Sequence, residues 1–245
     1  RWLGAELTAA DAGRWYFQAI GLNTLLPGAV VGGDVYRALA LRRTGQAPAA
    51  AGWSVVLDRV SGLWMLCAIG GLGAAACAQV LAPWLRLPVA VFASLLLAGT
   101  ALWLALPWAL PALLGQRPRA GGWLAPLRLA AARPDFRRQL GWQAAASVAV
   151  QLLSATALAA GALALGVQQP LAVWAWAIAP VFLMAALPLS VGGWGTREAA
   201  AVAALAPFGV AAPAAVGVAV VYGLYGLAQG ALGALAFGLP RNTTK

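Results

Sequence analysis

Six charged side chains stand within or beside long apolar runs, and they are the best candidates for chemistry in this sequence. They are Asp34, Arg37, Asp58, Arg59, Arg197 and Glu198. Guanidinium groups bind phosphate through paired hydrogen bonds, and neighbouring carboxylates orient the arginines or bind a cationic group. A charge within a bilayer costs roughly 2.5 to 3.5 kcal/mol even on a lenient insertion scale. The six residues therefore predict a polar cavity that holds a phosphate group.

Each of these charges also has a purely structural interpretation. Asp34 and Glu198 fall in the first turn of predicted helices, where the helix dipole favours an acid. Arg37 and Arg59 fit a cytoplasmic membrane boundary. Asp34 and Arg37 are three positions apart on one helix, so they are able to pair with each other. For any single residue the structural interpretation is at least as good, and only the group as a whole favours a functional one.

The group is favoured because two distant segments share one arrangement. Residues 26–37 read LPGAVVGGDVYR, and residues 187–198 read LPLSVGGWGTRE. Each has a Leu-Pro, a Gly-Gly and an arginine four positions after the second glycine. In a membrane protein such an interruption indicates a broken helix beside a polar site. The predicted backbone or hinge residues are Pro27, Gly32, Gly33, Pro188, Gly192, Gly193 and Gly195.

The composition identifies the medium in which these segments fold. Hydrophobic residues make up 62% of the chain and charged residues 9%, and the mean hydropathy is +0.82. Four long stretches carry no charged residue, and a helical span needs about 20 apolar residues. The ten-residue alternation of a membrane barrel is missing from the sequence. The chain is therefore predicted to be an all-α polytopic membrane protein, with about six or seven spans and two broken or re-entrant elements.

The expected elements follow from these runs and from the Pro and Gly positions that interrupt them. We expect a helix over 9–26, a short helix carrying Asp34 to Arg43, spans over 60–82, 88–114, 141–166 and 170–188, a short helix over 197–206 and a span over 214–239. They form one membrane domain over 1–245, with a first half of about 1–116 and a second half of about 139–245.

A basic segment, residues 117–138, separates the two halves with six arginines and one acid. The positive-inside rule places it in the cytoplasm. Trp123, Leu124 and Leu127 fit one face of a helix lying on an anionic leaflet. The alternative is a loop that only sets orientation and has no specific partner.

Several function classes are disfavoured by the composition. The chain has no histidine, which excludes His bases, His-ligated metals and Ser-His-Asp triads. The acids do not cluster at metal-ligand spacing, so we expect no metal, no cofactor and no catalytic residue. Nucleic-acid binding would need basic residues on a solvated domain, and none is present.

Three blocks of residues resemble a known family. They are residues 23–37 (Asn, then Leu-Pro-Gly, then Gly-Gly-Asp-x-x-Arg), 54–63 (Ser-Val-x-x-Asp-Arg-x-x-Gly-Leu) and 188–198 (Pro-x-Ser-x-Gly-Gly-x-Gly-x-Arg-Glu). Together they are similar to the signature blocks of the lysylphosphatidylglycerol synthase transmembrane family, which includes the flippase region of the multiple peptide resistance factor. The spans that usually precede the first block are expected to lie upstream of this chain.

The resemblance implies a multi-pass protein of the bacterial inner membrane that moves a lipid between leaflets, and it adds Asn23 and Ser190 to the substrate-binding residues. Since the chain has no soluble synthase domain, aminoacyl transfer is not implied. In the resulting hypothesis the three arginines engage the phosphate of a lipid headgroup and the three acids tune that charge. The alternatives are a membrane-embedded enzyme or accessory acting on a lipid phosphate, and a non-transporting scaffold that binds a partner through the basic loop.

Overall fold

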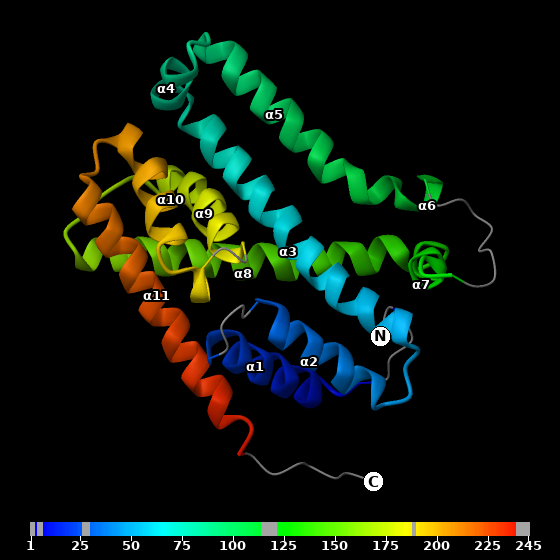
Figure 1. The fold of residues 1–245 in the computed structure, drawn as a ribbon. Helices are drawn as coiled ribbons and strands as arrows, with labels where there is room; N and C mark the ends of the chain where they lie inside the picture. Colours follow the sequence, from blue (N-terminus) through cyan, green and yellow to red (C-terminus); the bar gives the residue numbers. More distant parts are fainter. Residues whose placement is uncertain (1–2, 4–6, 26–29, 114–121, 188–189, 239–245) are drawn as a thin grey trace.

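The computed structural model describes residues 3, 7–25, 30–113, 122–187 and 190–238, and this part of the chain is helical without a strand (Figure 1). The α-helices are α1 (Ala9–Leu25), α2 (Val30–Arg42), α3 (Pro48–Ala76), α4 (Ala78–Leu81), α5 (Val89–Ala105), α6 (Leu110–Leu113), α7 (Ala125–Ala131), α8 (Phe136–Ala164), α9 (Leu171–Ala186), α10 (Thr196–Leu205) and α11 (Ala212–Leu235). Short 3-10 turns lie at Ala82–Leu85, Leu106–Ala109, Val191–Gly193 and Ala206–Phe208. The predicted hinge residues Pro27 and Pro188 lie outside the described residues, as do residues 117–121 of the basic segment.

The helices confirm an all-α polytopic membrane protein. Four of the described helices are long and apolar enough to cross a bilayer: Pro48–Ala76, Val89–Ala112, Phe136–Ala164 and Ala212–Leu235. The helix expected over 9–26 and the span expected over 170–188 are shorter, with 17 residues in α1 and 16 in α9. Many leucines on the long helices face outward, such as Leu102 and Leu153 with more than 70% of their surface exposed. Outward-facing leucines of this kind fit a lipid environment.

Helix α3 begins twelve residues before the span predicted from Val60, and this changes the position of two charges. Pro48 is the first residue of α3, where its missing N–H costs nothing, and no Pro interrupts the helix before Ala76. Asp58 and Arg59 therefore lie inside the long helix rather than at its boundary. At 1.5 Å per residue, Asp58 stands about 15 Å from the start of α3.

Close packing of small residues fixes the long helices around a common core. α3 packs against α5, α8 and α9, while α11 packs against α1 and α10. A Cβ atom at Gly73 would lie 2.4 Å from the backbone nitrogen of Trp176, and one at Gly70 would lie 2.5 Å from the Ala179 Cβ atom. The backbones of α3 and α9 thus approach as closely as small residues allow, which is how helices associate in a membrane.

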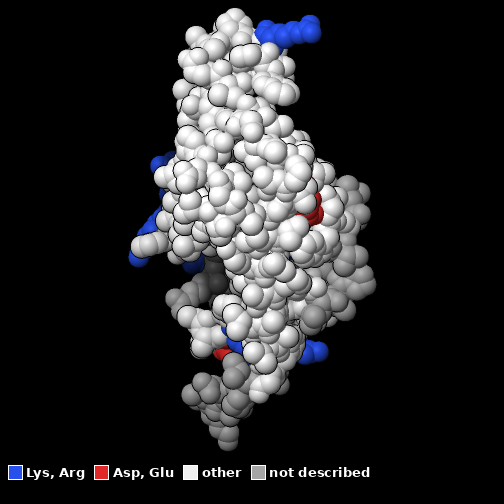
Figure 2. Space-filling view, turned by 90° about the vertical axis from the view of Figure 1, so that its left-hand side faces the viewer, with Lys and Arg blue, Asp and Glu red and all other residues white. Residues whose placement is uncertain are grey.

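The surface of the molecule has few charges, as expected of helices that lie in a membrane. Uncharged surface predominates on the face shown in Figure 2, and the few charged side chains lie mainly along its margins. Because a bilayer excludes unpaired charge, a wide uncharged band is the surface expected of a membrane domain.

Candidate functional site

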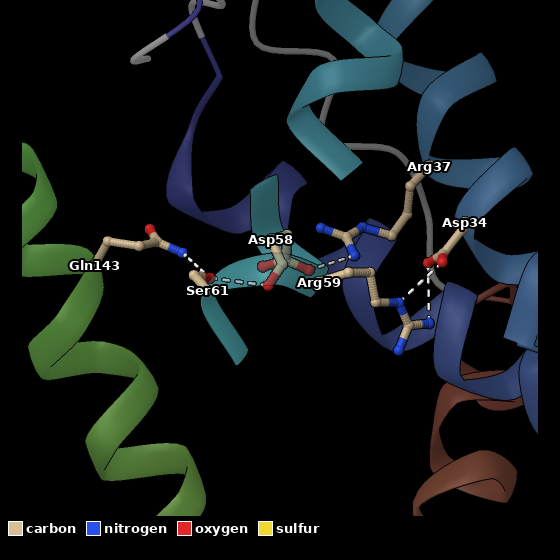
Figure 3. A network of polar contacts seen from close by, with 6 residues as sticks. All are labelled: Asp34, Arg37, Asp58, Arg59, Ser61 and Gln143. Atoms are coloured by element: carbon tan, nitrogen blue, oxygen red, sulfur yellow. Dashed lines mark hydrogen bonds and ion pairs between the residues drawn. The ribbon is translucent and has the colours of Figure 1, made fainter. Parts of the chain in front are cut away.

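The four charges of α2 and α3 form two ion pairs that cross between the helices (Figure 3). Arg37 donates from Nη1 to Asp58 Oδ2 at 2.7 Å. Arg59 donates from Nε and Nη2 to the two carboxylate oxygens of Asp34, at 2.9 and 3.0 Å. The pairing of Asp34 with Arg37 within one helix, which their spacing allowed, is therefore not the one that forms. Each acid instead meets an arginine of the other helix, because α2 packs directly against α3.

The Arg37–Asp58 pair continues into a line of polar contacts that reaches α8 (Figure 3). Ser61 Oγ donates to the carbonyl of Asp58 at 2.8 Å, and Gln143 Nε2 donates to Ser61 Oγ at 2.7 Å. On the other side, the Arg37 guanidinium carbon stands 5.3 Å from the centroid of the Tyr16 ring. Residues of α1, α2, α3 and α8 thus surround one group of charges.

A cavity of about 570 Å³ opens beside this network. Its polar lining comes from Arg37, Gln46, Ser54, Asp58, Ser61 and Gln143. The remaining lining is apolar and includes Leu57, Trp64, Leu106 and Leu110. A charged pair set in a mostly apolar wall suits a ligand that has a polar and an apolar part.

Asn23 and Gly33 join α1 to α2 beside the charged network. The Gly33 backbone N–H donates to Asn23 Oδ1 at 2.8 Å. A Cβ atom at Gly33 would lie 2.4 Å from the Ala19 carbonyl oxygen, so this position has no room for a side chain. Both Gly32 and Gly33 lie inside α2, whereas the sequence suggested a tight non-helical backbone there. The glycines pack against α1 within a helix instead.

The second Gly-Gly segment has a different backbone. Gly192, Gly193 and Gly195 have φ angles of +60°, +79° and +85°, the left-handed region that favours glycine. This turn starts α10 at Thr196, and the Gly195 backbone N–H donates to the Glu198 carboxylate. The Ser190 hydroxyl lies 3.1 Å from that of Thr196, which also donates to the Gly193 carbonyl.

Arg197 is enclosed by this second segment and by α11. Its Nε and Nη2 atoms donate to Glu198 Oε1 at 3.1 and 2.8 Å. The guanidinium lies 4.5 Å above the Trp194 ring, and a Cβ atom at Gly223 would lie 2.2 Å from its Nη2 atom. Arg197 is only 6% exposed, and Glu198 and Trp194 already contact its guanidinium.

Comparison with known proteins gives the chain a family. The family model described as the lysylphosphatidylglycerol synthase TM region matches residues 1–233. The chain belongs to this family. No curated protein and no solved structure showed a significant match. As a member of the lysylphosphatidylglycerol synthase TM family, the chain is a multi-pass membrane protein linked to lipid handling.

Within this family member the predicted substrate-binding residues divide into two groups. Arg37 and Asp58 line the cavity, and the Asp34–Arg59 pair lies beside them. The side-chain oxygen of Asn23 accepts the hydrogen bond from Gly33 that joins α1 to α2. Ser190 lies before α10, Arg197 and Glu198 lie in its first turn, and none of the three is among the residues that line the cavity.

Gln143 and Ser61 were missed by the sequence reasoning. The sequence argument started from charged residues, and both of these are uncharged: Ser61 lies on α3, and Gln143 lies on α8, within residues 139–196 that carry no charge. For Gln143 a signal was present, as polar residues at helical spacing along α8. Among the described residues, no three His, Cys, Asp or Glu side chains gather as metal ligands would.

Proposed function

We propose that this chain moves a phosphate-bearing lipid between the leaflets of the bacterial inner membrane and performs no covalent chemistry on it. The observation that carries the proposal is the cavity of about 570 Å³, in which the Arg37–Asp58 pair interrupts an otherwise largely apolar wall. A lipid has the same division, with one charged headgroup and long apolar chains. Membership of a family linked to lipid handling supports the same ligand class.

The charge balance of the network supports a site that is stable when empty and able to accept an anion. Two arginines and two acids leave no net charge, which lowers the cost of holding them in low dielectric. A headgroup phosphate replaces the Asp58 carboxylate as the partner of Arg37, because a guanidinium binds both anions through the same geometry. The Arg59–Asp34 pair stays intact beside it and keeps α2 against α3.

The basic segment supports an orientation for this movement. Trp53, near the start of α3, donates from Nε1 to the Trp123 carbonyl at 2.6 Å, and the two rings lie 5.5 Å apart. The beginning of α3 and the basic segment therefore share one side of the molecule, which also carries Arg42 and Arg43 at the end of α2. By the positive-inside rule this side faces the cytoplasm, and its arginines attract the anionic leaflet.

The test is transbilayer movement of acyl-labelled phospholipids in liposomes that contain the purified protein. The Arg37→Ala/Asp58→Ala double variant removes both charges at once and leaves no unpaired charge behind. We expect it to fold and to move anionic lipid at least about tenfold more slowly, the loss of roughly one charge-assisted hydrogen bond.

The matched control is Arg133→Ala/Asp135→Ala, which removes an exposed ion pair of the same residue types away from the cavity. This variant should move lipid at the wild-type rate. A wild-type protein that moves no lipid, or that changes the mass of the lipid, would refute the proposal; the second result would favour an enzyme.

A further inference from the structure

One face of α8 is polar over three turns, although no charged residue lies there. It carries Gln143, Ser147, Gln151 and Ser154. At 3.6 residues per turn these four positions fall within an arc of about 80° and extend over about 16 Å. A polar stripe of that length within a membrane-spanning helix is costly unless the stripe is satisfied or used.

The stripe begins at the network already described and crosses α3. Gln143 donates to Ser61 Oγ at 2.7 Å, and Gln151, two turns further along, donates to the carbonyl of Gly62 at 3.1 Å. Two glutamines two turns apart thus reach neighbouring residues of α3, so α3 crosses α8 between them (Figure 1). Ser147, one turn from each glutamine, is buried at 8% exposure.

Gln151 holds an unused hydrogen-bond acceptor at this crossing. The residue is 8% exposed, and its Oε1 atom is buried without a partner. The orientation of the amide follows from its other contact, because only the nitrogen is able to donate to the Gly62 carbonyl. Buried acceptors are nearly always paired with protein or water, so an acceptor without a protein partner is able to receive a donor from a ligand.

The far end of the stripe is also polar. The Ser154 side chain lies beside the Tyr222 side chain of α11. The Tyr222 ring packs against Phe182 of α9, with ring centroids 4.9 Å apart. The polar face of α8 therefore leads from Gln143 at the Arg37–Asp58 cavity to Tyr222 of α11.

We propose that the polar face of α8 is the path of the lipid headgroup, and that Gln151 Oε1 receives a headgroup carrying an O–H or N–H donor. This inference rests on the proposed function and deepens it. After the phosphate leaves Arg37, it moves along the stripe and forms hydrogen bonds with the hydroxyl and amide groups there. Because these groups carry no charge, they are able to release the phosphate again. A headgroup with hydroxyls or a primary ammonium satisfies Gln151, whereas a trimethylammonium headgroup has no donor to offer.

The test compares three acyl-labelled phospholipids with identical chains and glycerol, ethanolamine or choline headgroups in liposomes containing the full chain. We expect the wild-type protein to move the glycerol and ethanolamine lipids about tenfold faster than the choline lipid, the worth of one hydrogen bond. Gln151→Leu should reduce the rates of the glycerol and ethanolamine lipids about tenfold, to that of the choline lipid. The rate of the choline lipid should be the same in this variant as in the wild type. Ser147→Ala should lower the rates of the glycerol and ethanolamine lipids and provides a smaller second change on the same face.

Thr156→Val is the matched control, because Thr156 is an exposed polar residue of α8 whose hydroxyl donates to the Leu152 carbonyl of its own helix. Its rates should equal those of the wild type. If Gln151→Leu folds and moves all three lipids at wild-type rates, the path along α8 is wrong while the proposed function stands. If the wild-type protein moves no lipid, both are wrong.

Discussion

The two Gly-Gly-x-x-x-Arg segments differ in both backbone and charge pairing, despite their similar sequences. In the first, Gly32 and Gly33 lie within α2, and Arg37 crosses to an acid of α3. In the second, the glycines form a left-handed turn, and Arg197 pairs with its neighbour Glu198.

The Arg37–Asp58 pair is also more exposed than the Arg197–Glu198 pair. The side chains of Arg37 and Asp58 are 20% and 39% exposed, whereas those of Arg197 and Glu198 are 7% and 12% exposed. The first pair lines a cavity, and the second is closed by Trp194 and by the backbone of α11 at Gly223. A shared spacing of glycine and arginine therefore fixes neither the partner of the arginine nor its access to a ligand. We infer that the first pair serves the ligand and the second holds the fold.

The largest effect is expected where the second pair is broken. Glu198→Ala leaves the Arg197 guanidinium buried without its acid, which should lower the free energy of unfolding by about 3 to 5 kcal/mol. Thermal unfolding in detergent measures this loss. Glu198→Gln keeps an acceptor for the Gly195 N–H and should fall between Glu198→Ala and the wild type. A stability equal to wild type in Glu198→Ala would remove the structural role given to this pair.

The next effect concerns the glycines of the first segment. Gly33→Ala places a methyl group against the Ala19 carbonyl and Asn23, which should cost about 1 to 3 kcal/mol through strain. Gly13→Ala is the control, since nothing lies within 4 Å of a Cβ atom there and alanine favours the helix. Unfolding of the two variants under the same conditions compares them. Equal stabilities would mean that Gly33 is not needed for close packing of α1 and α2.

The smallest effect is expected at a third, exposed pair. Arg133 donates to Asp135 at 3.0 Å, and this hydrogen bond holds the pKa of the Asp135 carboxyl below its ordinary value. A lowered pKa adds stability at pH values above the ordinary pKa, and this contribution is lost as the pH falls through the lowered pKa of the folded state. Arg133→Ala should therefore reduce the unfolding temperature slightly at pH 7, and the reduction should shrink as the pH falls below about 4, where the unfolded carboxyl begins to be protonated. A reduction that persists at low pH would mean that Arg133 acts through other contacts.

The sequence was most informative about the elements and least about how charges pair. Apolar runs bounded by Pro and Gly predicted α1 to within one residue, because breakers and caps act locally. The start of α3 was misplaced because the acid and arginine at 58–59 resemble a membrane boundary, while the helix continues through them. Only tertiary packing decides whether Asp34 meets Arg37 or Arg59, since both lie within reach.

The polar face of α8 shows a second limit of the sequence reasoning. Gln143, Ser147 and Gln151 recur every four residues, a spacing that was readable without a structure. Their partners on α3 were not readable, because the crossing of two helices depends on small residues far apart in the chain. Uncharged polar residues at helical spacing within apolar runs are therefore a useful signal for family members of this kind.

The most direct test of the account is to locate a bound lipid. A phospholipid with a photoreactive diazirine near its headgroup is cross-linked to the protein in liposomes, and the labelled peptides are identified by mass spectrometry. We expect labels on α2 and α3 around Arg37 and Asp58, and we expect these labels to be lost in the folded Arg37→Ala/Asp58→Ala variant. Labels that persist in that variant, or that gather around Arg197 on α10, would contradict this expectation.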